Sequence, residues 1–251
     1  MIITNENYFS KEAELEYFGS TQFKNFRKCE AMTMAKINGE YEEEKSVALL
    51  VGGYVDAHFE GTLDLYAGQN PDIFTKGGDL KSDYKHANYI IERIERDEMF
   101  MKYMSGKKQV IMTGEWLGTK WKTKIDSYHE GKAIVDLKIM KDFEPVWVDD
   151  QGKISFVEAW GYDIQGAIYR KIEGNDLPFI IAGATKEKPE PDLSIMEIMP
   201  EDLATAENLI AAYLPRFIDV KAGLVEPRRC EQCPYCRRTK KLTKVISYKE
   251  L

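Results

Sequence analysis

Two aspartates and a lysine lie at spacings that could hold a metal ion and act on a phosphate. Asp136 and Lys138 are two residues apart in a stretch rich in β-branched residues, so on a strand their side chains emerge on the same face. Asp126 precedes them across the short segment 128–131, where antiparallel pairing can place it alongside. Two carboxylates suit Mg²⁺ or Mn²⁺, and a neighbouring lysine can orient or deprotonate water. The set therefore suits phosphodiester hydrolysis, but it equally suits a half-exposed edge strand.

The surrounding residues predict the elements that position this set. Stretches rich in β-branched and aromatic residues, separated by turns that contain glycine, predict an antiparallel meander over 110–118, 121–128 and 133–139. Apolar periodicity predicts helices over about 20–32, 43–59, 86–104, 155–173 and 201–220, and an apolar run predicts a strand over 179–184. This order predicts an α/β fold in which helices flank a mixed central β-sheet.

Composition limits the class of protein. The chain has 251 residues, of which 43% are hydrophobic and 31% charged, which excludes a disordered, collagen-like or disulfide-rich chain. We expect one domain with a helical part (1–105), a catalytic core (106–225) and a basic tail (226–251). No apolar stretch approaches the ~20 residues that cross a bilayer, and no secretory signal is visible, so we expect a cytoplasmic protein without a membrane partner.

Charge is unevenly distributed along the chain. The net charge is −7, but residues 227–251 carry a net +6, which leaves −13 on the rest. A basic tail on an acidic body suits a nuclease whose carboxylates hold cations, and it suits a merely solvated tail about equally well. Charge therefore does not exclude a nucleic-acid partner.

The order Ile125-Asp126 … Ile134-Val-Asp136-Leu-Lys138 resembles the split signature of PD-(D/E)XK nucleases, with Ile125 in place of the usual proline. Gln165 and Tyr169 resemble the Gln-x-x-x-Tyr motif of the RecB-like and phage-exonuclease branch of that superfamily. Four residues apart on a helix, these two side chains share one face. The resemblance implies a restriction-endonuclease-like core in which both residues join the catalytic set.

Two further residues acquire a role from this resemblance. His58, in Gly53-Tyr-Val-Asp-Ala-His58, stands where the branch carries a helical histidine that binds the metal. Glu115 precedes Asp126 by one strand, where related exonucleases often place an acidic residue near a second metal. Without the resemblance, a buried hydrogen-bonded histidine is the better interpretation of His58, and an exposed strand glutamate is about as good an interpretation of Glu115.

Four cysteines form a second candidate site. Cys29 lies on the apolar face of the first predicted helix, and Cys230, Cys233 and Cys236 lie near the end of the chain. In a reducing compartment clustered thiols more often hold a metal than form disulfides. One cysteine before the nuclease motifs and three after them resembles the [4Fe–4S] nucleases of the AddB-like and CRISPR-adaptation types. The last gap is shorter than in those proteins, so zinc, or thiols that bind nothing, stay as alternatives.

The whole chain most resembles the RecE-like group of phage and prophage exonucleases. Members of that group degrade one strand of duplex DNA from an end, and the remaining single strand serves an annealing recombinase. Ring-shaped homo-oligomers also occur among them. Two other functions stay open: an iron–sulfur nuclease of the CRISPR-adaptation type that trims short DNA, and a DNA-binding module that has lost its chemistry.

Overall fold

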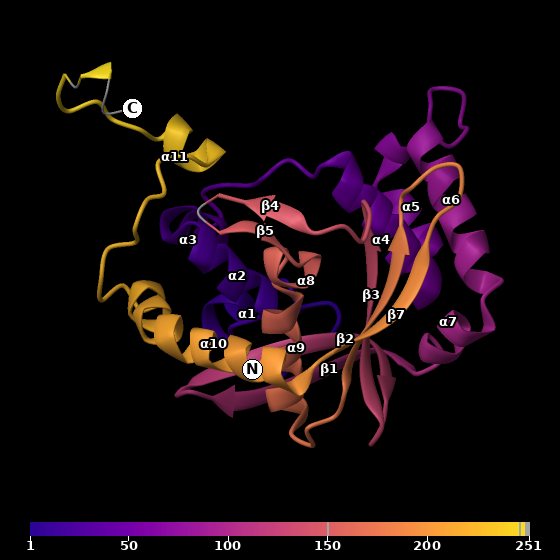
Figure 1. Cartoon of the computed structure of the whole chain (residues 1–251). Helices are drawn as coiled ribbons and strands as arrows, with labels where there is room; N and C mark the ends of the chain where they lie inside the picture. The colour runs from indigo at the N-terminus through magenta and orange to yellow at the C-terminus, as the bar shows by residue number, and fades with distance from the viewer. Residues whose placement is uncertain (150, 246, 249–251) are drawn as a thin grey trace.

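The computed structural model describes residues 1–149, 151–245 and 247–248, so Lys249 of the predicted basic tail lies outside the described residues (Figure 1). The helices are α1 (Lys11–Glu16), α2 (Ser20–Lys28), α3 (Glu30–Asn38), α4 (Val47–Glu60), α5 (Leu63–Gln69), the 3₁₀ turn η1 (Pro71–Ile73), α6 (Ser82–Glu95), α7 (Glu98–Tyr103), α8 (Phe156–Ala159), α9 (Tyr162–Glu173), α10 (Pro200–Lys221) and α11 (Pro234–Arg238). The strands are β1 (Lys107–Trp116), β2 (Thr119–His129), β3 (Ala133–Met140), β4 (Val146–Val148), β5 (Gly152–Ile154), β6 (Phe179–Thr185) and β7 (Leu193–Ile198).

A mixed five-stranded sheet runs through the molecule in the order β1-β2-β3-β6-β7. The first three strands form the predicted antiparallel meander, β6 runs parallel to β3, and β7 is antiparallel to β6. The predicted α/β fold with a mixed central sheet is therefore confirmed. The sequence analysis missed β7 and the small β4–β5 hairpin.

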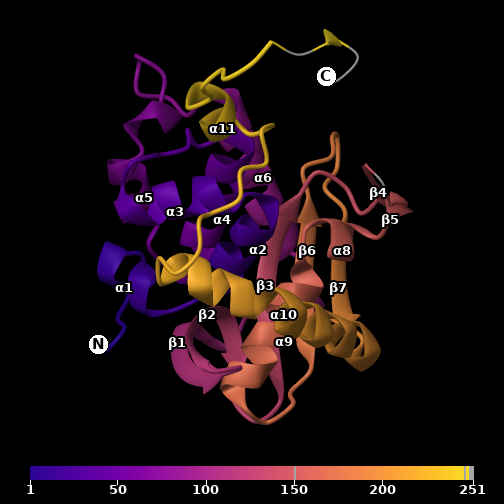
Figure 2. The same ribbon diagram turned by 90° about the vertical axis from the view of Figure 1, so that its left-hand side faces the viewer.

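Helices cover both faces of this sheet. In Figure 1, α4, α5, α6 and α7 lie to the right of the strands, and α1, α2, α3, α9 and α10 lie to the left. Figure 2 shows α10 crossing in front of the strands. One apolar cluster packs α2, α9 and α10 against the sheet through side chains that include Phe23, Ile168 and Phe217. The other packs α4 and α6 against the opposite face through side chains that include Val55, Ile90 and Val135.

Two predicted helices each divide where one residue leaves the helical backbone conformation. The first divides at Cys29, whose extended backbone ends α2 and begins α3, and whose sulfur accepts the N–H of Met32. The predicted helix over 155–173 divides at Gly161, which has a left-handed backbone (φ +63°) between α8 and α9. A regular apolar spacing runs across both breaks, which is why periodicity alone predicts continuous helices.

Strands β2 and β3 separate beside the motif residues. Their backbone pairing runs from His129 and Ala133 to Ser127 and Val135, and no further pair follows in the described strands. At the next step the Asp126 carboxylate accepts the N–H of Leu137 at 2.9 Å. Continued backbone pairing was expected to bring Asp126 beside β3. Instead, the Asp126 side chain bonds to the backbone of β3 where the next backbone pair would form, and the two strands separate. This separation opens the cleft described below.

No helix in the described part of the chain is long and apolar enough to cross a membrane.

Candidate functional site

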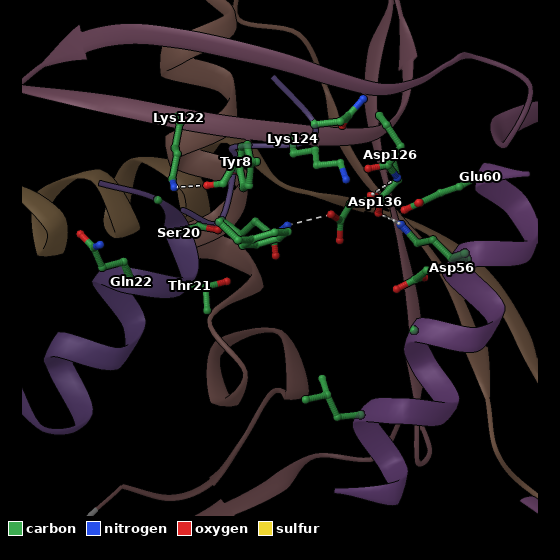
Figure 3. A pocket seen from close by; sticks show the side chains of 18 of the residues that line it. Tyr8, Ser20, Thr21, Gln22, Asp56, Glu60, Lys122, Lys124, Asp126 and Asp136 are labelled. Atoms are coloured by element: carbon green, nitrogen blue, oxygen red, sulfur yellow. Dashed lines mark hydrogen bonds between the residues drawn. The ribbon is translucent and has the colours of Figure 1, made fainter. Parts of the chain in front are cut away.

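A cleft of about 1210 Å³ opens where β2 and β3 part. Strand β2 lines it with Lys122, Lys124 and Asp126, which alternate onto one side of the strand. Strand β3 contributes Asp136 and Lys138, and α9 contributes Gln165 and Tyr169. Helices α2 and α3 form one wall and α4 the other, so that Asp56 and Glu60 extend from α4 toward Asp126 and Asp136 (Figure 3).

Asp136 is held from two sides in the cleft. The side-chain N–H of Gln165 donates to its Oδ1 at 2.7 Å, and Lys138 forms an ion pair with its Oδ2. The residue is only 2% exposed, and within the described residues the buried Oδ2 meets only the Lys138 ammonium. A cation that binds Oδ2 would therefore do so beside Lys138 or in its place.

Two other carboxyl groups of the cleft, those of Asp56 and Asp126, have raised pKa values. Burial and the charge of Asp136 raise the pKa of Asp126 well above its usual value. Burial also raises the pKa of Asp56 to about 7, with Asp136 adding to the shift and Lys138 opposing it. Burial is the main cause of both shifts, so a cation bound between these carboxyl groups would favour their charged forms.

Lys138 stays charged in this setting. Burial alone would lower its pKa, but Asp136 and Asp126 outweigh that effect and raise the pKa above its usual value. The ammonium group also lies 5.4 Å from the centre of the Tyr162 ring, a cation–π contact. Lys138 can therefore hold an anionic oxygen or a water molecule beside Asp136.

Tyr169 joins helix α9 to strand β2 beside the cleft. Its hydroxyl donates to the backbone carbonyl of Lys124 at 3.0 Å, and burial raises its pKa. Gln165 lies one helical turn earlier on the same face, as the sequence analysis expected. Helix α9 therefore fixes both strands, β3 through Asp136 and β2 through the backbone of Lys124.

Asp56 and Glu60 are cleft residues that the sequence analysis missed. Gly53, Asp56, Ala57 and Glu60 all line the cleft, which is the spacing of one helix face. Glycine is favoured at position 53, because a Cβ there would lie 3.0 Å from the Tyr66 ring. The sequence already indicated this face, because Asp56 and Glu60 lie four residues apart beside the apolar face of α4.

His58 does not lie in this cleft. Its Nε2 is 2.8 Å from Oε1 of Glu95 on α6, and both side chains are partly exposed. Two positions along an α-helix turn a side chain by about 200°, so His58 and Asp56 face nearly opposite directions. The expectation that His58 meets the two aspartates is corrected, and Asp56 is the residue of α4 that faces them.

Glu115 also lies apart from the cleft. It stands opposite Lys120 near the β1–β2 turn, six residues along β2 from Asp126, or roughly 20 Å. The residue of β1 beside Asp126 is Gln109, whose side-chain N–H lies 3.4 Å from Oδ1 of Asp126. Gln109 has a left-handed backbone (φ +51°) and interrupts the strand pairing at this point. The expected second-metal position of Glu115 is therefore corrected.

The four cysteines come together at the start of α3. Their sulfur atoms all lie within 4.8 Å of one another, and none of the four forms a disulfide. The Sγ of Cys236 is 3.5 Å from that of Cys29 and 4.0 Å from that of Cys230. Backbone N–H groups of Cys233 and Cys236 donate to the sulfurs three residues before them. The set could hold a metal ion.

An ion pair that does not involve the cysteines also holds the segment around Cys29. The carboxylate of Glu30, beside Cys29, accepts two hydrogen bonds of 2.8 Å from Arg216 of α10 and one of 2.7 Å from the N–H of Arg228. The N–H of Ala31 donates to the carbonyl of Arg228. The junction between α2 and α3 is thus joined to the end of the chain by two independent sets of contacts.

The chain resembles known proteins over most of its length. Residues 19–239 match the family model described as a PDDEXK-like domain of unknown function (DUF3799). A solved structure named "Putative exonuclease", from Eubacterium rectale, is 51% identical, with a TM-score of 0.96 and coverage of 100% of this chain and 98% of that one. The solved structure of SSO0001 is 16% identical, with a TM-score of 0.32 and coverage of 86% and 91%. A comparison with curated proteins gives no match.

Proposed function

This chain belongs to the family of PDDEXK-like domains, and from that membership we propose that it is a divalent-metal-dependent exodeoxyribonuclease that degrades one strand of linear duplex DNA from an end. A nuclease is the activity that the family and the half-identical exonuclease relative support. The observation that carries the proposal is the convergence of Asp56, Asp126 and Asp136 with Lys138 in one cleft.

The donor set of the cleft suits a hard divalent cation. Carboxylate oxygens are the ligands that Mg²⁺ and Mn²⁺ prefer, and Asp56, Asp126 and Asp136 all line one cleft. The buried Oδ2 of Asp136, whose partner in the described residues is the Lys138 ammonium, adds a further donor. A cation held by these three residues would polarise the phosphate and help to activate water.

The chain's own residues would then orient the substrate. Lys138 holds a phosphate oxygen or the attacking water next to Asp136, and Gln165 keeps the Asp136 carboxylate in place. Lys124 projects into the cleft between Lys122 and Asp126 on β2, where it can contact the DNA backbone (Figure 3). Lys122 is occupied by Glu14 and by the carbonyl of Tyr8, so its role is to hold the wall of the cleft.

The biological setting is the wider part of the proposal. The resemblance to RecE-like enzymes supports phage-type recombination, with an annealing recombinase as the partner that receives the single strand. It also supports a homo-oligomer, which would keep the enzyme on its substrate.

Digestion of end-labelled DNA tests this function. Linear duplex labelled at the 5′ or the 3′ end, and a covalently closed circle of the same sequence, are incubated with Mg²⁺. We expect loss of label from one end only, an intact circle, and no reaction by Asp136→Asn. Cutting of the closed circle would replace the exonuclease proposal by an endonuclease, and full activity of Asp136→Asn would refute the catalytic site.

We propose that the four cysteines hold one zinc ion. A tetrahedron with Zn–S bonds of about 2.3 Å has edges of about 3.8 Å. Two of the sulfur pairs are 3.5 and 4.0 Å apart, and all four sulfurs lie within 4.8 Å of one another. A [4Fe–4S] cluster attaches its thiolates to four separate iron atoms, so their sulfurs lie further apart than around a single ion. The compact spacing thus favours zinc over the cluster that the resemblance implies.

The cysteine site also supports a second candidate function. An iron–sulfur nuclease of the CRISPR-adaptation type, which trims short DNA, would place its cluster at these four residues. Iron in the purified protein together with a preference for short single strands over long duplex would favour it. Zinc together with a preference for long duplex ends would favour the exonuclease.

A further inference from the structure

Lys24 of α2 reaches toward the catalytic centre from outside the residues assigned above. Its ammonium group lies 3.4 Å from the carbonyl of Trp160 and 5.8 Å from the centre of the Tyr162 ring. The same ring lies 5.4 Å from the ammonium group of Lys138. The Tyr162 ring thus forms cation–π contacts with two lysines from different elements. Lys138 of β3 is paired with Asp136, and Lys24 of α2 is not.

A glycine makes room for this side chain. Gly161, between α8 and α9, has a left-handed backbone, and a Cβ there would lie 2.7 Å from Cδ of Lys24. A substitution would therefore displace the Lys24 stem and also strain the backbone. The Lys24 side chain therefore packs against the backbone at the break between α8 and α9, where Gly161 leaves space for it.

The Lys24 ammonium lacks an anionic partner. Within the described residues no carboxylate lies within ion-pair distance of it, although Lys138 and Asp136, Lys28 of its own helix and Asp163 of α9 all act on it electrostatically. Burial and the charge of Lys138 lower its pKa to about 8. A partly desolvated cation in this position is stabilised by an added anion.

We infer that Lys24 binds a backbone phosphate of the DNA strand being cut, beside the phosphate held at Lys138. The inference rests on the proposed nuclease function and adds a subsite to it. Trp160 and Tyr162 hold the lysine in position, and the phosphate supplies the missing counter-charge. Lys24 would then contribute to substrate binding through its charge, without sequence preference.

Three variants test this subsite. Lys24→Met keeps the length of the side chain and removes the charge, and Lys24→Arg keeps the charge. Lys28→Met makes the same change at an exposed position one turn along α2. Binding to labelled duplex ends is measured without Mg²⁺ at several salt concentrations, cleavage is measured with Mg²⁺, and Tm is recorded for each protein. We expect Lys24→Met to weaken binding about tenfold and to reduce the slope of log Kd against log salt by about one. Lys24→Arg should restore most of the affinity, and Lys28→Met should change it less.

The outcomes separate this inference from the proposed function. If wild-type protein binds duplex ends and Lys24→Met binds them with unchanged affinity and salt slope, the subsite is refuted and the nuclease proposal stands. If Lys24→Met lowers Tm alone, Lys24 merely caps the Trp160 carbonyl and the subsite is again refuted. A wild-type protein that binds duplex but never cleaves it refutes the nuclease, while the binding comparison still decides the role of Lys24.

Discussion

Gln165 on α9 holds Asp136 on β3 by a hydrogen bond of 2.7 Å to the oxygen that faces away from Lys138. The contact joins a helix to the centre of the sheet across a buried interface. Because the other oxygen of Asp136 meets Lys138, the carboxylate is fixed at both ends. Its orientation is therefore set before any substrate arrives.

Loss of this hydrogen bond should reduce turnover more than affinity. We expect Gln165→Leu to lower kcat by about 10- to 100-fold, since an outer partner that orients a metal-binding carboxylate has effects of that size. Gln165→Glu places a second carboxylate next to Asp136 and should lower kcat further than Gln165→Leu does. Single-turnover cleavage of linear duplex measures both, and Tm serves as the folding control. Wild-type kcat in Gln165→Leu would show that Asp136 needs no such support.

Two neighbouring residues of α4 should behave in opposite ways. Asp56 faces the cleft carboxylates and His58 faces Glu95, so only the first should affect the metal. We expect Asp56→Asn to raise the Mg²⁺ concentration for half-maximal activity by about tenfold or more, and His58→Gln to leave it near the wild-type value. Mg²⁺ titrations of cleavage compare the pair. A large effect of His58→Gln with none of Asp56→Asn would reverse the assignment.

Metal analysis should find zinc. Protein purified without oxygen should be colourless, with about one zinc and no iron per chain. Cys29→Ser should lose the zinc and lower Tm, because binding free energy at such a site is also folding free energy. Glu30→Gln weakens the neighbouring clasp to Arg216 and Arg228 and should keep the zinc. Brown protein that contains iron would contradict the zinc assignment.

Lys221 should make stability depend on pH. Burial lowers its pKa from 10.5 to about 7, although its ammonium group donates to the Tyr17 carbonyl and to Gln22. Between these two pH values the folded protein binds fewer protons at Lys221 than the unfolded chain does. The free energy of unfolding should therefore rise with pH across this window, by at most about 1.4 kcal/mol per pH unit from this one group.

The matching variant isolates that contribution. Urea unfolding at pH 7, 8 and 9 should give a smaller pH slope for Lys221→Met than for wild type. Lys132→Met, at an exposed position of the β2–β3 turn, should keep the wild-type slope. Equal slopes in all three proteins would mean that Lys221 titrates alike in the folded and unfolded states.

Local spacing predicted the parts of the site that depend on one element. Asp136 and Lys138 share a strand face because strands alternate, and Gln165 and Tyr169 share a helix face because helices repeat every 3.6 residues. Both relationships hold in the cleft. Neither needs knowledge of how separate elements pack.

The residues that sequence reasoning misplaced depend on packing between elements. Whether Asp56 or His58 faces the sheet is set by the rotation of α4 against β3, which its apolar pattern defines only to within a neighbouring position. Glu115 was misplaced because the β1–β2 turn fixes the register, and Gln109 then falls beside Asp126. Cys29 itself is buried and grouped with the other cysteines as expected, but the continuous apolar period conceals the helix break at its position.

The long sequence separation of Cys29 and Cys236 has a consequence for how the protein is made. The two are 207 residues apart, so a ribosome that adds about 5–20 residues per second reaches the second about 10–40 seconds after the first. Throughout that interval the nascent α2 and α3 lack the segment that joins them at Cys29. The wall that these helices give the cleft is then completed at the end of translation.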